Sequence, residues 1–228
     1  LNIFSTHVVG VNSYARRTAR TKLAKWTTLY DGIAAPRDNQ ILRSAYKPSS
    51  VFRIVMVGRF HECKNIAFAL EVVSEIKKNR EVEIILIGRE SPAIRSELDI
   101  IISKYRLHDS VLFMGEMPGP AVFENMVDSN LLMLTSTREG LPGTVLEASA
   151  LGVPVLSSDL PGVVEIQEHI PSVGTLSLRE SASVWSDAAI NQAQIWNSRR
   201  NEIRQYFLNS PFTLENHVTR LEEVWRFQ

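Results

Sequence analysis

The stretch FRIVMVGRFHECKNIAFALEVVSEIKKNREVEIILIG, residues 52–88, has the clearest structural pattern in the chain. It begins with a β-rich apolar run at 52–57 and ends with a second one at 83–87. Between them, residues 64–79 have helical spacing, with apolar side chains recurring every three or four positions. Two strands joined by a helix predict a parallel pair whose connecting helix covers one face of the sheet.

The same alternation of short apolar runs and longer helical patterns continues to about residue 157. The further strand candidates are 111–114, 131–135 and 154–157. The further helix candidates are 92–105, 121–128 and 144–151. From about residue 180 the apolar spacing is helical again. The pattern predicts an α/β fold, a Rossmann-like parallel sheet flanked by helices, with additional helices toward the C-terminus.

The two ends of the chain differ from this central part. The N-terminal residues predict a strand, a helix capped by Ser13 and a second strand at 26–30. We therefore divide the chain into a connecting region at 1–46, a ligand-binding domain at 47–210 and a final helix at 211–228. The final helix is expected to pack back across the region between domains.

The composition excludes several classes of protein. The 228 residues include 25 Lys and Arg against 25 Asp and Glu, a net charge of 0, so the overall charge does not point to a nucleic-acid partner. Cys63 is the single cysteine, which excludes an internal disulfide and a cysteine-rich zinc site. No apolar run is long enough for a membrane span, and no secretory signal is visible. We expect a cytoplasmic protein and, because the chain begins without Met, a part of a larger one.

In open parallel sheets, ligands bind at the carboxyl ends of the strands. The loop after the strand 52–57 contains Arg59 and Lys64 and leads into a helix. Two cations beside the free N–H groups of a helix start are a candidate diphosphate site. The alternative is that Arg59 pairs with a carboxylate and Lys64 is solvated. A P-loop is excluded, because the sequence G-x-x-x-x-G-K-[ST] is absent.

The loop after the strand 131–135 has two carboxylates around a glycine-rich turn. Glu139 lies in the turn, and Glu147 lies about one turn into the helix that begins near Thr144. Helical side chains lean toward the N-terminus, so the two carboxylates should flank the free N–H groups. Because a carboxylate accepts two hydroxyl hydrogen bonds, this suits a diphosphate with hydroxyl groups at both ends. The alternative is that Glu139 caps the helix and Glu147 is a surface residue with a cation partner.

Several short motifs follow one another in a fixed order. They are Glu139-Gly140-Leu141-Pro142, Glu147-Ala148, Gly152-Val153-Pro154-Val155 and Gly162 to Glu165. With Arg59 and Lys64 at matching spacing, and Phe113-Met114-Gly115 between the two groups, the chain resembles family 4 of the retaining glycosyltransferases, which have the GT-B fold. The resemblance runs from about residue 3 to the final helix and implies one half of a GT-B fold.

The resemblance implies a role for each candidate residue. Arg59, Lys64 and Glu139 would be catalytic: the two cations would hold the diphosphate and stabilise it as a leaving group, and Glu139 would contact the transferred sugar near its 3-hydroxyl. Glu147 would bind the ribose hydroxyls. Further donor contacts would come from the backbone of Gly140, Leu141, Pro142, Gly143, Thr144 and Val145, and from Gly115 and Met117 beside the base. No metal and no cofactor would be required.

The implied enzyme is a retaining hexosyltransferase of cell-surface polysaccharide assembly. Its partners would be a nucleotide-sugar donor and a saccharide or lipid-linked acceptor, without nucleic acid. The basic stretch 15–25 would suit peripheral contact with a membrane. Residues 1–46 would be a remnant of the N-terminal domain with the interdomain connector. Since the acceptor cleft would lie on the other half, we expect this chain alone to show little or no transfer.

Two positions depart from the family pattern. Asp31 stands where Asn commonly precedes Gly. Arg89-Glu90 follows Gly88 where a second glycine is usual, which predicts less close backbone approach there. Other functions stay open at this stage: a nucleotide-binding or regulatory module without catalysis, and a nucleotide-sugar epimerase or sugar phosphorylase of similar fold. The epimerase needs acid and base groups that no motif here supplies.

Overall fold

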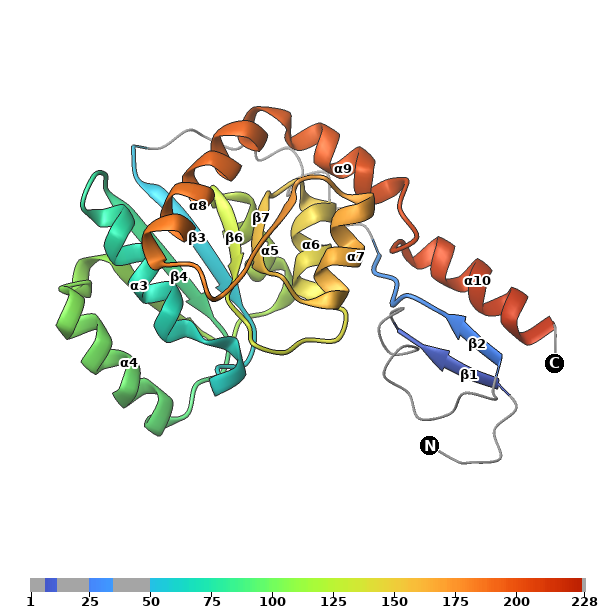
Figure 1. The fold of residues 1–228 in the computed structure, drawn as a ribbon, viewed down its shortest axis with the longest axis horizontal. Helices are drawn as coiled ribbons and strands as arrows, with labels where there is room; N and C mark the ends of the chain where they lie inside the picture. Colours follow the sequence, from blue (N-terminus) through green and yellow to red (C-terminus); the bar gives the residue numbers. More distant parts are fainter. Residues whose placement is uncertain (1–6, 12–24, 35–49, 227–228) are drawn as a thin grey trace.

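The computed structural model describes residues 7–11, 25–34 and 50–226. Its centre is a six-stranded sheet in which neighbouring strands are parallel, in the order β5-β4-β3-β6-β7-β8 (Figure 1). The strands are β3 (Phe52–Val57), β4 (Val82–Ile87), β5 (Val111–Gly115), β6 (Leu131–Leu134), β7 (Val155–Ser158) and β8 (Val173–Leu176). The predicted α/β fold with a Rossmann-like parallel sheet is confirmed.

The strand order reverses in the middle of the sheet. From β3 the chain builds outward through β4 to β5, and it then returns to β6 on the other side of β3 and continues through β7 to β8. The boundary between β3 and β6 is therefore a topological switch point, the place where open α/β sheets bind their ligands. The loops that leave these two strands contain Arg59, Lys64 and Glu139.

The sheet separates two hydrophobic cores. In β3, Ile54 and Met56 belong to one core and Val55 to the other, as the period of two along a strand requires. The first core is covered by α3 (Ile66–Lys77), α4 (Pro92–Tyr105) and α8 (Ala182–Trp196). The second is covered by α5 (Gly119–Val127), α6 (Gly143–Leu151), α7 (Pro161–His169) and α9 (Arg200–Leu208). Burial on both faces explains why the strands are continuous apolar runs.

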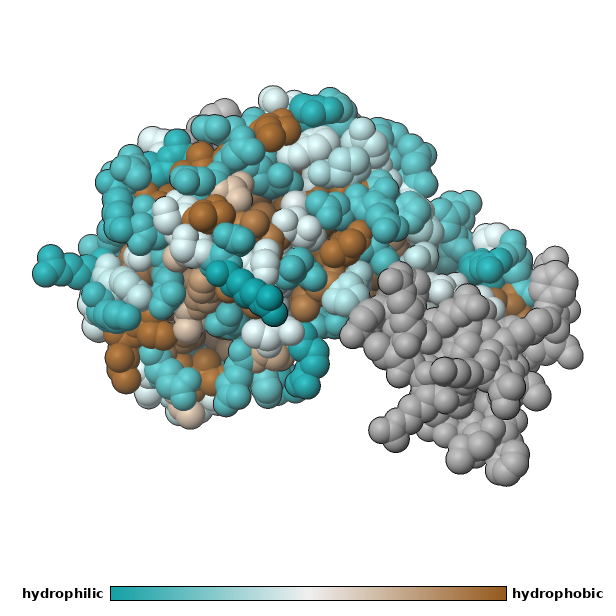
Figure 2. Space-filling model, in the orientation of Figure 1, coloured by the Kyte–Doolittle hydropathy of each residue, from teal (hydrophilic) through white to brown (hydrophobic). Residues whose placement is uncertain are grey.

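Hydrophobic and hydrophilic residues are intermixed on the face shown in Figure 2. Trp185 of α8 is fully buried, whereas Trp225 of the last helix is 72% exposed. The ring of Trp185 meets that of Phe68 edge-on, 5.6 Å apart, and its Nε1 donates to the carbonyl oxygen of Ser177 at 3.0 Å. None of the helices in the described part of the chain is both long and apolar enough to cross a membrane.

The N-terminal strands lie apart from the main sheet (Figure 1). β1 (His7–Gly10) and β2 (Lys25–Thr28) form a separate parallel pair. The second of these strands begins and ends slightly earlier than the predicted strand at 26–30. The predicted helix after Ser13, and almost all of the basic stretch 15–25, lie outside the described residues.

The last helix, α10 (Leu214–Arg226), is joined to the segment that follows β2. Ile33 donates its N–H to the carbonyl oxygen of Phe212 at 3.0 Å, and Leu214 donates to the carbonyl oxygen of Ile33 at 2.9 Å. The ring of Tyr30 packs edge-on against Phe212, with 5.0 Å between centroids. These contacts hold the start of α10 beside the segment 30–33.

Three details differ from the sequence prediction. The helix predicted at 64–79 begins only at Ile66, because Asn65 has a left-handed backbone, φ 48°, that separates α3 from a 3-10 turn at Glu62–Lys64. Neither α7 nor β8 was predicted. The Pro-Gly start of α7 reads as a turn, although proline is tolerated in the first turn of a helix. β8 is a short edge strand, and only one of its four residues is buried.

Gly162, in the first turn of α7, packs against the loop that follows β6. A Cβ added at Gly162 would lie 1.9 Å from the carbonyl oxygen of Gly140. We expect Gly162→Ala to lower the free energy of unfolding by about 1–3 kcal/mol, because one of the two backbones must shift. Thermal or denaturant unfolding measures this loss.

The matched control is Gly119→Ala in the first turn of α5. Nothing lies within 4 Å of a Cβ added there, so alanine should cost only the small penalty of a helical residue before Pro120, less than the loss at Gly162. Equal stabilities of the two variants would show that the contact between Gly162 and Gly140 does not constrain the fold.

Candidate functional site

Hydrogen bonds join the loop after β3 to the loop after β6. The hydroxyl of Thr135, directly after β6, donates to the carbonyl oxygens of Lys64 and Asn65, both at 3.0 Å. The N–H of Thr137 donates to the carbonyl oxygen of Cys63 at 2.8 Å. Thr135 is fully buried, so water does not compete for its bonds. The two loops at the switch point therefore form one rigid unit.

Lys64 and Glu139 meet across this junction. The Nζ of Lys64 lies 2.6 Å from Oε1 of Glu139, and the hydroxyl of Ser136 donates to the same oxygen at 2.8 Å. The two charged side chains are only 21% and 17% exposed. Charges in so little water attract more strongly than surface charges do, so each neutralises the other in the ligand-free chain. Two of the predicted catalytic residues are thus in direct contact.

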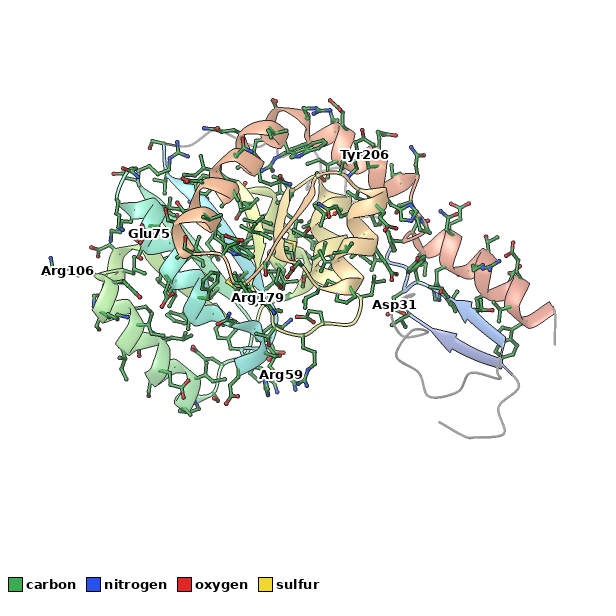
Figure 3. The ribbon with its side chains drawn as sticks, in the orientation of Figure 1. Asp31, Arg59, Glu75, Arg106, Arg179 and Tyr206 are labelled. Atoms are coloured by element: carbon green, nitrogen blue, oxygen red, sulfur yellow. The ribbon has the colours of Figure 1, made fainter. Side chains whose placement is uncertain are left out.

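Arg59 lies on the same loop as Lys64 but has no ion-pair partner among the described residues. Its side chain is exposed. Figure 3 shows it at the end of the molecule toward which the central strands point. The alternative in which Arg59 is paired and Lys64 is solvated is therefore wrong, because the two cations have the opposite roles. A free guanidinium can bind an anion through two parallel N–H groups.

Open space lies next to the backbone at the start of α6. The N-cap of this helix is Pro142, and no side chain caps it, so the alternative in which Glu139 is the cap is wrong. Cβ atoms added at Gly140 or Gly143 would meet nothing within 4 Å. A ligand can therefore approach this backbone closely, as anions do at helix N-termini.

The remaining predicted residues of this segment differ in their surroundings. Leu141 is half-buried against the second core, Pro142 and Val145 are buried, and Thr144 is half-buried. The N–H of Val145 donates to the carbonyl oxygen of Pro142 at 3.1 Å. A ligand that accepts the predicted hydrogen bond from the Val145 N–H would therefore share this donor with the carbonyl oxygen of Pro142.

Glu147 is a half-buried carboxylate in the second turn of α6. It makes no ion pair or hydrogen bond with another described residue, Glu139 and Lys64 included. Burial raises the pKa of the Glu147 carboxyl above its ordinary value of 4.5, because the charged form loses solvent. The described residues therefore give no support to the alternative of a surface residue with a cation partner. A desolvated carboxylate without a partner costs stability, which is a common mark of a binding site.

A cavity of about 250 Å³ lies where β3, β4 and β5 end. Arg59 and Met117 line it, and Gly115 ends β5 beside it with a left-handed φ of 68°. Arg89 and Glu116 also line this cavity. Arg89 was not among the predicted site residues, whereas Glu116 lies between Gly115 and Met117, in the loop predicted to border the base. Their signal in the sequence was position, because each directly follows a glycine at the end of a strand.

Lys64 and Arg59 border two different cavities. Lys64 borders a small apolar space of about 10 Å³, separate from the cavity that Arg59 lines. A larger cavity, about 580 Å³, lies between the segment 28–30 and α10 and contains none of the predicted site residues. Among the described residues, no three His, Cys, Asp or Glu side chains gather into a metal site.

Comparison with known proteins identifies the family to which the sequence is similar. The model of the glycosyl transferases group 1 matches residues 51–191. CapH, a capsular polysaccharide biosynthesis glycosyltransferase of Staphylococcus aureus, is 24% identical over 226 residues, which cover 92% of this chain and 62% of CapH.

Two solved structures share the fold. A glycosyltransferase from Rickettsia africae has a TM-score of 0.82 at 17% identity, covering 97% of this chain and 63% of its own. HepE from Anabaena, crystallised with UDP, has a TM-score of 0.81 at 18% identity, covering 100% of this chain and 65% of its own. The chain thus spans less than two thirds of these relatives. Because the family model covers more than half of it, this chain belongs to the glycosyl transferases of group 1.

Proposed function

We propose that this chain is the donor-binding half of a retaining glycosyltransferase of family 4, which transfers a hexose from a nucleotide-diphosphate sugar to an acceptor. The observation that carries the proposal is the contact of Lys64 with Glu139 at the switch point of the sheet. Arg59 lies on the same loop as Lys64, without an ion-pair partner in the part of the chain that the structure describes. Cations and a carboxylate at this place match the two chemical parts of a donor, a diphosphate and a sugar.

Arg59 and Lys64 bind the diphosphate in this proposal and stabilise the charge that develops on it as the sugar leaves. Lys64 is held by Glu139 before the donor binds, at 2.6 Å, so it is placed in the site without being free in solvent. Once a phosphate takes Lys64, the Glu139 carboxylate can accept hydroxyl hydrogen bonds from the transferred sugar. The reaction needs no metal or other cofactor, because the two side chains supply the positive charge.

Glu147 binds the ribose hydroxyls in the same proposal. Its carboxylate lacks a partner among the described residues, and two hydroxyl donors would supply the hydrogen bonds that burial has removed. The open backbone at Gly140 and Gly143 leaves room for the diphosphate and the sugar between Glu147 and Glu139. In the same proposal Gly115 and Met117 contact the nucleobase of the donor, at the cavity where β3, β4 and β5 end.

The longer protein is proposed to act in cell-surface polysaccharide synthesis, on a saccharide or lipid-linked acceptor. CapH carries that role in its name, and HepE was crystallised with UDP, which supports a nucleotide-sugar donor here. We assign residues 1–46 to the N-terminal domain and connector, 47–210 to the donor domain and 211–228 to the returning helix. A cytoplasmic location with peripheral membrane contact through the basic stretch 15–25 belongs to the same proposal.

Nucleotide binding without metal tests the donor site. We expect UDP, GDP or ADP to bind this chain in EDTA, and Glu147→Ala to weaken the bound nucleotide by roughly 1.5–3 kcal/mol, about 10- to 150-fold, because charge-assisted hydrogen bonds are lost. Calorimetric titration measures both affinities. Glu202→Ala, which removes an exposed carboxylate of α9, is the control and should bind like the wild type. Wild-type affinity in Glu147→Ala would overturn the role given to Glu147.

The pH dependence of stability tests the burial of the Glu147 carboxyl. Its pKa is raised in the folded chain, so the folded state holds the proton more tightly than the unfolded state near pH 4.5 and above. The ionised Glu147 carboxylate therefore lowers the free energy of unfolding as the pH rises through the raised pKa. We expect Glu147→Gln to melt at a higher temperature than the wild type at pH 7–8, with the difference shrinking toward pH 4. A difference independent of pH would mean that the carboxylate is not desolvated.

A further inference from the structure

Glu139 accepts both of its hydrogen bonds from described residues on one carboxylate oxygen. The Nζ of Lys64 lies 2.6 Å from Oε1, and the hydroxyl of Ser136 donates to the same oxygen at 2.8 Å. The other oxygen, Oε2, has no hydrogen-bond partner among the residues that the structure describes. Because a carboxylate oxygen is an acceptor only, Oε2 is the atom that remains for a ligand hydroxyl.

A diphosphate acts differently on the two donors that hold Glu139. Lys64 is a cation, and under the proposed function it turns to the phosphate when the nucleotide-sugar binds. The hydroxyl of Ser136 is neutral, and its residue is fully buried, so a ligand does not reach it. After Lys64 has turned away, Ser136 is the donor within the described part of the chain that still holds the Glu139 carboxylate.

Neighbouring loops fix the backbone that carries Ser136. The carbonyl oxygen of Ser136 accepts a hydrogen bond from the hydroxyl of Ser158, the last residue of β7, at 2.5 Å, and both serines are buried. The next residue, Thr137, donates its N–H to the carbonyl oxygen of Cys63 at 2.8 Å. The hydroxyl of Ser136 is therefore attached to a backbone that is held from two sides, which makes it a fixed donor.

The loop that carries Lys64 is held in turn by the loop after β4. A Cβ added at Gly88 would lie 1.9 Å from the carbonyl oxygen of Gly58, so the two loops touch. The close backbone approach predicted to be reduced here by Arg89 is in fact present at Gly88. Because the backbone is fixed on both sides, the exchange of the ion pair for a phosphate contact is left to the side chains of Lys64 and Glu139.

We propose that Ser136 is a positioning residue, which holds the Glu139 carboxylate toward the transferred sugar after the diphosphate has taken Lys64. This inference rests on the proposed function, because it says how the same carboxylate keeps its place in the loaded site. Without the Ser136 hydroxyl, the carboxylate is free to turn to solvent or back to Lys64, where it competes with the phosphate. Ser136 does not touch the donor and acts only through Glu139.

Calorimetric titration of this chain with a nucleotide and with its sugar conjugate separates the sugar contact from the nucleotide contacts. The pairs are UDP with UDP-glucose, GDP with GDP-mannose, and ADP with ADP-glucose. For the pair that binds the wild type, we expect Ser136→Ala to weaken the conjugate by about 3- to 30-fold, because one hydrogen bond to a charged group is lost. The affinity for the nucleotide alone should stay within about twofold of the wild type. A merely structural defect would weaken both ligands alike.

Two further variants make the test independent of folding defects. Ser136→Cys fills nearly the same volume with a much weaker donor, so it should show the same difference between the two ligands even where Ser136→Ala does not fold. Ser158→Ala is the matched control, because it removes another buried serine hydroxyl, one that bonds to the backbone of Ser136 and not to Glu139. It should not separate the conjugate from the nucleotide.

A double-mutant cycle tests whether Ser136 acts through Glu139. In a Glu139→Ala background, Ser136→Ala should cause no further loss of affinity for the conjugate, because the side chain that it positions is absent. A further loss there, an equal loss for both ligands in Ser136→Ala, or full affinity for both would overturn the role of Ser136 and leave the donor site intact. Binding of a nucleotide without its conjugate would also overturn it, since no sugar would then meet Glu139. Failure of the wild type to bind any of the six ligands would instead overturn the proposed function.

Discussion

The ion pair between Lys64 and Glu139 connects the two halves of the sheet at the point where the strand order reverses. It depends on the buried hydroxyl of Thr135, which holds the backbone of Lys64 against the end of β6. A parallel sheet places these loops at one edge, and this contact turns them into a single site. Gly140 and Arg59 lie on the two loops that meet at this junction, and Arg59 has no charged partner within the described part of the chain.

The site combines a rigid backbone with charges that the chain itself does not fully satisfy. Glycines allow carbonyl groups of neighbouring loops to lie where a side chain would otherwise stand, at Gly88 against Gly58 and at Gly162 against Gly140. Glu147 and Arg59 lack charged partners among the described residues. Holding such groups in place lowers stability, and a ligand with hydroxyl and phosphate groups would restore the missing interactions.

The sequence could predict the strands and helices of the central sheet because the patterns that indicate them lie within short segments of the chain. Apolar runs at 52–57 and 83–87 predicted strands, and those strands exist as β3 and β4, the second one residue longer. The prediction of α3 failed at its start because Asn65 has a left-handed backbone, which asparagine tolerates but does not require. β8 was missed because an exposed edge strand lacks the apolar run on which the prediction relied. The ion pair of Arg89 with Glu116 was missed because 27 positions separate the two residues along the chain.

By itself, the sequence determined the fold class and which loops contain the chemistry, because hydrophobic periodicity and the position of a residue after a strand are properties of neighbouring residues. It left both arrangements of charge open: Arg59 paired with Lys64 solvated, or the reverse. Only the tertiary structure decided that Lys64 meets Glu139, that Arg59 has no charged partner among the described residues, and that the Glu147 carboxylate is desolvated. Pairing and burial depend on which distant segments the sheet brings together, and Coulomb attraction and hydration change steeply over those few ångströms.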